Sequence, residues 1–97
     1  MPRYVTLINW TDQGVKNFKD SVDRYEAAQK AMSEGGVSFR DIYWTVGPYD
    51  LVGIVEAPDD ETATAALLSV AGQGNIRTIT LRAFDAGEMR GVIEKAS

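Results

Sequence analysis

The chain has 97 residues, with 10 Lys or Arg against 14 Asp or Glu, so its net charge at pH 7 is −4. A chain of this length buries only roughly 60 to 65% of its unfolded surface, which predicts one domain of modest stability that gains from oligomerisation. The absence of Cys and His excludes disulfides, thiolate nucleophiles, cysteine metal sites and the usual acid–base group at neutral pH.

Charge and hydropathy also limit the kinds of partner that we expect. A net negative charge argues against nucleic acid, whose binding depends on Lys and Arg at the phosphates. The first residues, MPRYVTLINW, lack the apolar region of a signal peptide, and no apolar run has the length of a membrane helix. We therefore expect a soluble, cytoplasmic protein without a cofactor or metal and with no nucleic-acid or membrane partner.

Six elements are predicted in the order β-α-β-β-α-β. Residues 3–10 alternate and are rich in β-branched and aromatic residues, which favours a strand. A helix capped by Thr11 or Asp12 follows and ends at Gly35-Gly36. Its predicted apolar stripe is Val15, Phe18, Val22, Tyr25 and Met32.

The second half of the chain continues this pattern. Residues 37–46 and 50–57 are predicted strands. Asp59 or Asp60 caps a second helix, whose inner side is formed by Ala63, Ala66, Leu67 and Val70. Residues 76–84 form the fourth strand, and the tail at 85–97 can make only a short helix through Met89, Val92 and Ile93.

The order of elements predicts an α+β, ferredoxin-like βαββαβ domain over residues 1–97. Its sheet has four antiparallel strands, and both helices cover the same face. If Val5 and Leu7 face the helices, the other side chains on that face of the sheet are Ile42, Trp44, Val46, Leu51, Val55, Ile79 and Leu81. Gly53 is expected on that side too, next to Phe18 or Tyr25, where a side chain would overpack the core.

The opposite face has no helix to cover it. On this assignment it carries Tyr4, Thr6, Ile8, Trp10, Tyr43, Thr45, Asp50, Val52, Ile54, Glu56, Thr78, Thr80, Arg82 and Phe84. The mixture is too apolar to stay wet and too polar for a dry core, which predicts a sheet-to-sheet homodimer that encloses a polar-lined cavity. Arg82 is expected inside it, either paired with Glu56 or Asp50 or free as an anion receptor.

Four motifs occur in order along the chain: INWTDQG, GPYD, VEAPDDETA and GNIRTITLRAFD. In these motifs the chain resembles the GYD-motif family of small bacterial proteins, over nearly its whole length. The resemblance implies a ferredoxin-like subunit of the dimeric α/β-barrel kind, and it implies no activity. The residues that name the family correspond to Gly47, Tyr49 and Asp50, with Pro48 at a variable position between them.

The stretch from Gly47 to Asp50 joins the second and third strands. Pro48 holds φ at about −65°, which suits the second position of a type I turn and excludes a two-residue hairpin of type I′. Asp50 is expected to accept hydrogen bonds from the turn amides. Two interpretations remain open: these residues only shape the turn and cover an edge, or Tyr49 overhangs the mouth of a pocket.

Acidic residues also open the second helix, at Asp59, Asp60 and Glu61. Acids at this position suit the helix dipole and the free amides of the first turn. The stretch lacks the spacing of a calcium loop. We therefore interpret it as a helix start and not as a metal site.

Three hypotheses about function remain. The first is a non-enzymatic module that binds a small apolar or aromatic molecule in the dimer cavity. The second, by analogy with cofactor-independent oxygenases of this barrel, is an oxygenase or isomerase acting on a readily deprotonated substrate held by Asn9, Trp10 or Trp44, and Arg82. The third is a purely structural homo-oligomer. The candidate ligand-binding residues are Tyr4, Thr6, Trp10, Tyr43, Thr45, Tyr49, Asp50, Glu56, Thr80 and Arg82.

Overall fold

The computed structural model describes residues 1–97 and forms a four-stranded sheet with helices. The elements in chain order are β1 (Arg3–Trp10), α1 (Asp12–Lys16), α2 (Ser21–Glu34), β2 (Ser38–Trp44), β3 (Leu51–Glu56), α3 (Asp60–Ala71), β4 (Ile76–Ala83) and α4 (Ala86–Ala96). A short 3-10 turn over Phe18–Asp20 links α1 to α2. None of the helices has the length and apolar content that crossing a membrane requires.

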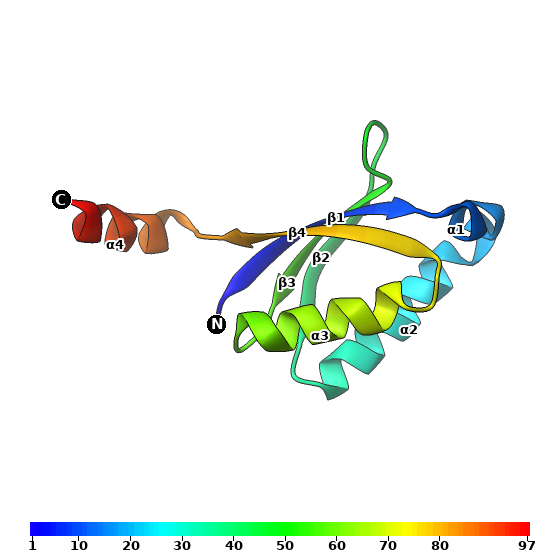
Figure 1. The fold of residues 1–97 in the computed structure, drawn as a ribbon, viewed down its shortest axis with the longest axis horizontal. Helices are drawn as coiled ribbons and strands as arrows, with labels where there is room; N and C mark the ends of the chain where they lie inside the picture. Colours follow the sequence, from blue (N-terminus) through cyan, green and yellow to red (C-terminus); the bar gives the residue numbers. More distant parts are fainter.

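The sheet runs in the order β2-β3-β1-β4, and all neighbouring strands are antiparallel. Figure 1 shows α2 and α3 on one side of the sheet, while the loop between β2 and β3 projects on the other side. Strand order and helix placement are those of the ferredoxin-like fold, so the predicted fold class is confirmed.

The core lies between the sheet and this helical layer. Along β1 and β3, every second residue is buried, because a strand turns alternate side chains to one face. The hydrophobic core consists of Tyr4, Met32, Val37, Val55, Ala57, Ala63 and Leu67. Only 13 of the 97 residues are buried, so the core is small even for a chain of this length.

The first predicted helix is interrupted in the structure. Asn17 leaves the helical conformation (φ −104°, ψ 34°) at the end of α1, and Arg24 donates a hydrogen bond of 2.6 Å to the carbonyl oxygen of Asn17. The break shifts the phase of the apolar stripe. Val15, Phe18 and Val22, predicted to be buried, are therefore 50%, 57% and 52% exposed.

The faces assigned to β1 and β4 were wrong. Tyr4, Thr6 and Ile8 are buried beneath the helices, so Val5 and Leu7 lie on the opposite face. Directly paired residues share a face, and Val5 pairs with Leu81, as Leu7 does with Ile79. For β3 the assignment was right, since Leu51 and Val55 are buried.

α4 extends away from the body of the molecule, beyond the end of the sheet where β4 stops (Figure 1). Asp85 and Glu88 form a capping box at its start. Every residue from Phe84 to Ser97 is exposed. The helix expected in the tail is thus present, but it packs against nothing in its own chain.

Candidate functional site

The face of the sheet that points away from α2 and α3 is uncovered, and we call it the open face (Figure 1). Its side chains are Arg3, Val5, Leu7, Asn9, Asp41, Tyr43, Val52, Ile54, Glu56, Arg77, Ile79, Leu81 and Ala83. The centre is apolar, and Ile79 and Leu81 are 51% and 48% exposed. A contiguous apolar area on a small protein is typical of an interaction surface.

Charged residues gather at the end of the open face where β1 begins. Arg3 Nε donates to Glu56 Oε1 at 3.1 Å, and Arg3 also lies 3.6 Å from Asp85. Arg40 approaches the same Glu56 oxygen at 3.6 Å. The hydrogen bond and the charge of Glu56 raise the pKa of Arg3 above its ordinary value. These residues and Phe84 surround a shallow hollow of about 380 Å³.

Five of the candidate residues lie on the covered face, opposite to the one predicted: Tyr4, Thr6, Trp10, Thr80 and Arg82. Tyr4 is buried, and its phenol donates a hydrogen bond to Asp60. Burial first, and then this hydrogen bond, raise the pKa of Tyr4. Thr6 is fully buried, and its hydroxyl lies 3.3 Å from that of Thr80. Tyr4 thus joins β1 to α3, and Thr6 and Thr80 join β1 to β4.

Arg82 shares this face, because it pairs with Tyr4 across β1 and β4. Its guanidinium lies 4.6 Å from the ring centre of Phe84 and 5.8 Å from that of Tyr4. It donates to the carbonyl oxygens of Arg3 and Ala83. The side chain is exposed and its hydrogen bonds go to backbone carbonyls, so both predicted versions of Arg82 inside a cavity were wrong.

The loop that carries the GPYD motif is held by its own hydrogen bonds. The Thr45 hydroxyl donates to the carbonyl of Tyr49 at 2.6 Å, and the Thr45 N–H donates to the carbonyl of Asp50 at 2.8 Å. Gly47 has φ 133°, which a residue with a side chain rarely adopts. The carboxylate of Asp50 accepts from the backbone N–H of Trp10, not from the turn amides as predicted.

The residues proposed for an oxygenase are not assembled within one chain. Asn9 pairs with Arg77, whereas Arg82 pairs with Tyr4. Five residues along a strand separate the two sites by roughly 16 Å. Asn9 also lies on the open face and Arg82 on the covered one. Of the ten candidate ligand-binding residues, Tyr43 and Glu56 lie on the open face as predicted.

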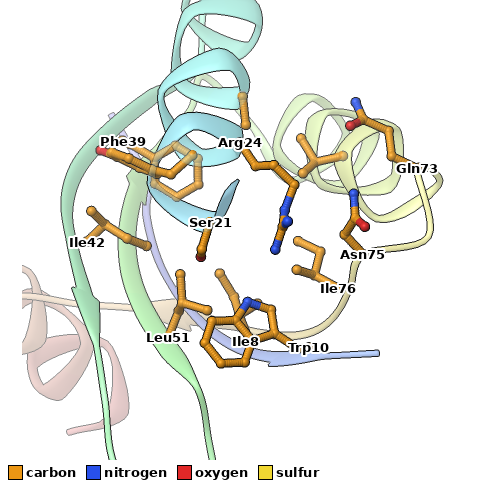
Figure 2. A pocket seen from close by; sticks show the side chains of 13 residues that line it. Ile8, Trp10, Ser21, Arg24, Phe39, Ile42, Leu51, Gln73, Asn75 and Ile76 are labelled. Carbon is orange, nitrogen blue, oxygen red and sulfur yellow. The ribbon is translucent and has the colours of Figure 1, made fainter. Parts of the chain in front are cut away.

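A small pocket opens between the sheet and the helices, beside the start of α2 (Figure 2). Its volume is about 60 Å³ and most of its lining is hydrophobic, including Ile8, Trp10 and Ile76. Arg24 reaches into it, as Figure 2 shows, and donates to the carbonyl of Gly14 at 3.3 Å. Sequence reasoning missed Arg24, because nothing in its neighbourhood distinguishes it from other exposed cations of a helix.

A second group of residues, whose contact with one another the sequence analysis did not predict, joins α1 to the loop before β4. The Thr11 hydroxyl donates to the carbonyl of Gly74 at 2.6 Å, and Gln13 donates to Asn75 Oδ1 at 2.9 Å. Gly14 packs so closely that a Cβ would lie 2.0 Å from the carbonyl oxygen of Asn75. The TDQG and GQGN segments therefore form one structural clasp.

No group of three or more Asp or Glu side chains is placed to hold a metal ion. Fold and open face together define a small ferredoxin-like α+β domain. The chain belongs to the GYD family: the family model described as GYD domain matches residues 4–93, which confirms the resemblance. Gly47, Tyr49 and Asp50 lie in the loop described above.

One relative is the glutamine synthetase and cystathionine beta-lyase binding protein of Thermus thermophilus, 33% identical over 90 residues that cover 92% of this chain and 95% of the relative. The fold is similar to that of a feast or famine regulatory protein from M. tuberculosis complexed with L-methionine, with TM-score 0.67, 15% identity and 89% of this chain covered. This chain spans about half, 52%, of that protein. A structure of TTHA0845, also from Thermus thermophilus, is 30% identical, with TM-score 0.49 and coverages of 89% and 96%.

Proposed function

We propose that this GYD-domain protein is a non-catalytic protein-binding domain that works as a homodimer, and that two copies pair through the open face. The observation that carries the proposal is the uncovered apolar centre of that face, formed by Val5, Leu7, Val52, Ile54, Ile79 and Leu81. Burying an apolar side chain is worth roughly 1.5 to 3 kcal/mol. A monomer leaves this free energy unused.

The charges at the end of the open face support pairing with a second copy. Arg3 and Arg40 lie next to Glu56 and Asp85, so the same surface offers both signs. In a twofold dimer, each contact of one residue with a second residue of the other copy occurs twice, so a surface that carries both charges away from the axis can complement itself. Tyr43 and Glu56 would lie at this interface and stay part of the proposed binding surface.

Protein partners beyond the second copy are supported by the relative from Thermus thermophilus, which is named for binding glutamine synthetase and cystathionine beta-lyase. The match covers 95% of that relative, so the two chains have nearly the same extent. With the open face used for pairing, the outer sides of α2 and α3 remain free for such partners. The cytoplasm remains the proposed location.

Sedimentation equilibrium of the Leu81→Glu variant tests the dimer. Leu81, on the open face of the edge strand β4, is 48% exposed, while Leu68 on α3 is 66% exposed on the helical side. We expect the wild type to be a dimer at micromolar concentration, Leu81→Glu to be a folded monomer, and Leu68→Glu to remain a dimer. A wild-type chain that sediments as a folded monomer contradicts the proposal.

A second candidate function is the binding of a small apolar molecule, which the pocket in Figure 2 favours. Two polar side chains at its wall are already engaged, since Ser21 accepts a hydrogen bond from the Trp44 indole at 2.9 Å and Arg24 binds backbone carbonyls. A ligand there would be recognised mainly by shape. Native mass spectrometry of the freshly purified protein tests this candidate, because it reports retained ligand and stoichiometry together; Ala28→Leu, which narrows the pocket, should abolish any retained ligand.

A further inference from the structure

α4 has an apolar stripe with no partner in its own chain. Met89, Val92 and Ile93 are 45%, 38% and 53% exposed, and with Ala96 they recur at the spacing that lines up one side of a helix. The other side of α4 carries Arg90, Glu94 and Lys95 together with Gly91. The helix is thus amphipathic in the way of helices that pack against a protein surface.

Length argues that α4 needs such a surface. It has 11 residues, and isolated helices shorter than about 12 to 15 residues are only marginally stable in water. The capping box of Asp85 and Glu88 stabilises the first turn, and Gly91 weakens the middle by about 1 kcal/mol relative to Ala. Local interactions alone leave the helix marginal.

The connection to β4 directs α4 outward. Only Phe84 and Asp85 separate Ala83, the last residue of β4, from the helix. Asp85 accepts from the N–H of Glu88 and also lies 3.6 Å from Arg3 of β1. Folding the helix back over its own open face would require the contact between Asp85 and Arg3 to break. Figure 1 shows the result, with α4 standing clear of the sheet.

We infer that α4 is an intermolecular arm, whose apolar stripe packs against a second copy of this chain at the rim of the open-face interface. The inference rests on the homodimer proposed above. A stable interface takes in roughly 20 to 30 residues on each side, and the open face supplies only about a dozen, since each strand offers every second residue. The stripe of α4, continuous with the end of β4, extends the interface toward the size that a stable dimer needs.

The first experiment is a substitution in the stripe. Val92→Asp with Ile93→Asp places two charges on the apolar side, while Arg90→Gln with Lys95→Gln changes the net charge equally on the polar side. We expect the first pair to raise the dimer Kd roughly 100-fold, which corresponds to the loss of two partly buried side chains. The second pair should leave Kd unchanged. Neither pair touches the core, so both variants should still unfold in one cooperative transition.

The second experiment finds what α4 contacts. Benzoylphenylalanine in place of Ile93 should give covalent dimers on illumination, with the crosslinked peptide in the partner's strands, whereas the same residue in place of Glu94 should give few. Crosslinks confined to one chain, or a stripe variant that dimerises like the wild type, would overturn the inference. The two proposals fail separately: Leu81→Glu tests the open face, and the α4 variants test the arm.

Discussion

The carboxylate of Asp50 accepts a hydrogen bond from the backbone N–H of Trp10 at 2.9 Å, and the N–H of Asp50 donates to the carbonyl of Ile8 at the same distance. Pairing of β1 with β3 ends at Ile8 and Leu51. The carboxylate thus satisfies the next donor of β1 at the point where the chain turns into the loop. Asp50, one residue of the GYD motif, therefore attaches the loop between β2 and β3 to β1 by two hydrogen bonds.

Asp50→Ala should lower the free energy of unfolding by about 1.5 kcal/mol, because the half-buried N–H of Trp10 loses a charged acceptor. Chemical denaturation measures the loss. Glu26→Ala, which removes an exposed carboxylate from α2, away from the open face, is the control and should change stability little. An equal loss of unfolding free energy in both variants would show that the hydrogen bond between Asp50 and Trp10 contributes no stability of its own.

Gly14, in the clasp between α1 and the loop before β4, and Gly91, in α4, should respond in opposite ways to substitution by Ala. Gly14→Ala should cost roughly 2 to 4 kcal/mol, because the new Cβ would collide with the backbone of Asn75. Gly91→Ala meets no atom within 4 Å in α4, and it should raise the helix content seen by circular dichroism. A Gly14→Ala variant as stable as the wild type would mean that the clasp opens freely.

Gly53 lies on the helix-facing side as predicted, but its neighbours differ. A Cβ there would lie 3.1 Å from Phe39 and 3.2 Å from both Ile42 and Thr6, instead of beside Phe18 or Tyr25. Gly53→Val should overpack this region and cost roughly 1 to 3 kcal/mol. The fall in melting temperature measures this loss of stability, and Gly53→Ala should give a smaller fall than Gly53→Val. A variant that melts at or above the wild-type temperature would contradict this packing.

Stability should fall at high pH because of Tyr4. Burial and the hydrogen bond to Asp60 raise the pKa of Tyr4, so the fold favours the neutral phenol. The stabilisation is complete below the unfolded pKa of about 10 and is lost as pH rises through the higher folded value. We expect the free energy of unfolding to decline less steeply with pH for Tyr4→Phe than for the wild type. Denaturation measures it between about pH 8 and 11, a range on both sides of the ordinary tyrosine pKa of about 10. The same slope in both proteins would refute the linkage.

Much of the fold could be predicted from the sequence. The order of elements, the ends of β3, and the start of α3 followed from alternation, from Pro58 and from acids at a helix start. Asp59 does cap α3, as its carboxylate accepts from the N–H of Thr62 at 2.7 Å. These are local signals, which short stretches of chain carry by themselves.

The faces of β1 could not be read by alternation, because both are apolar: Tyr4 and Ile8 are on one, Val5 and Leu7 on the other. Pairing decides between them, since Tyr4 lies opposite Val55, and pairing is a long-range property. The error carried over to Tyr4, Thr6, Trp10, Thr80 and Arg82, and so to half of the ten candidate residues. The break at Asn17 was missed for a related reason, as the arginine that binds its freed carbonyl comes seven residues later.

The small core has a consequence for the cell. A chain with 13 buried residues has little stability of its own, so pairing through the open face would add stability by mass action. The melting temperature would then rise with protein concentration. At low expression the equilibrium would shift toward monomers, which unfold more often and are exposed to proteases. The lifetime of each molecule would in this way depend on how abundant the protein is.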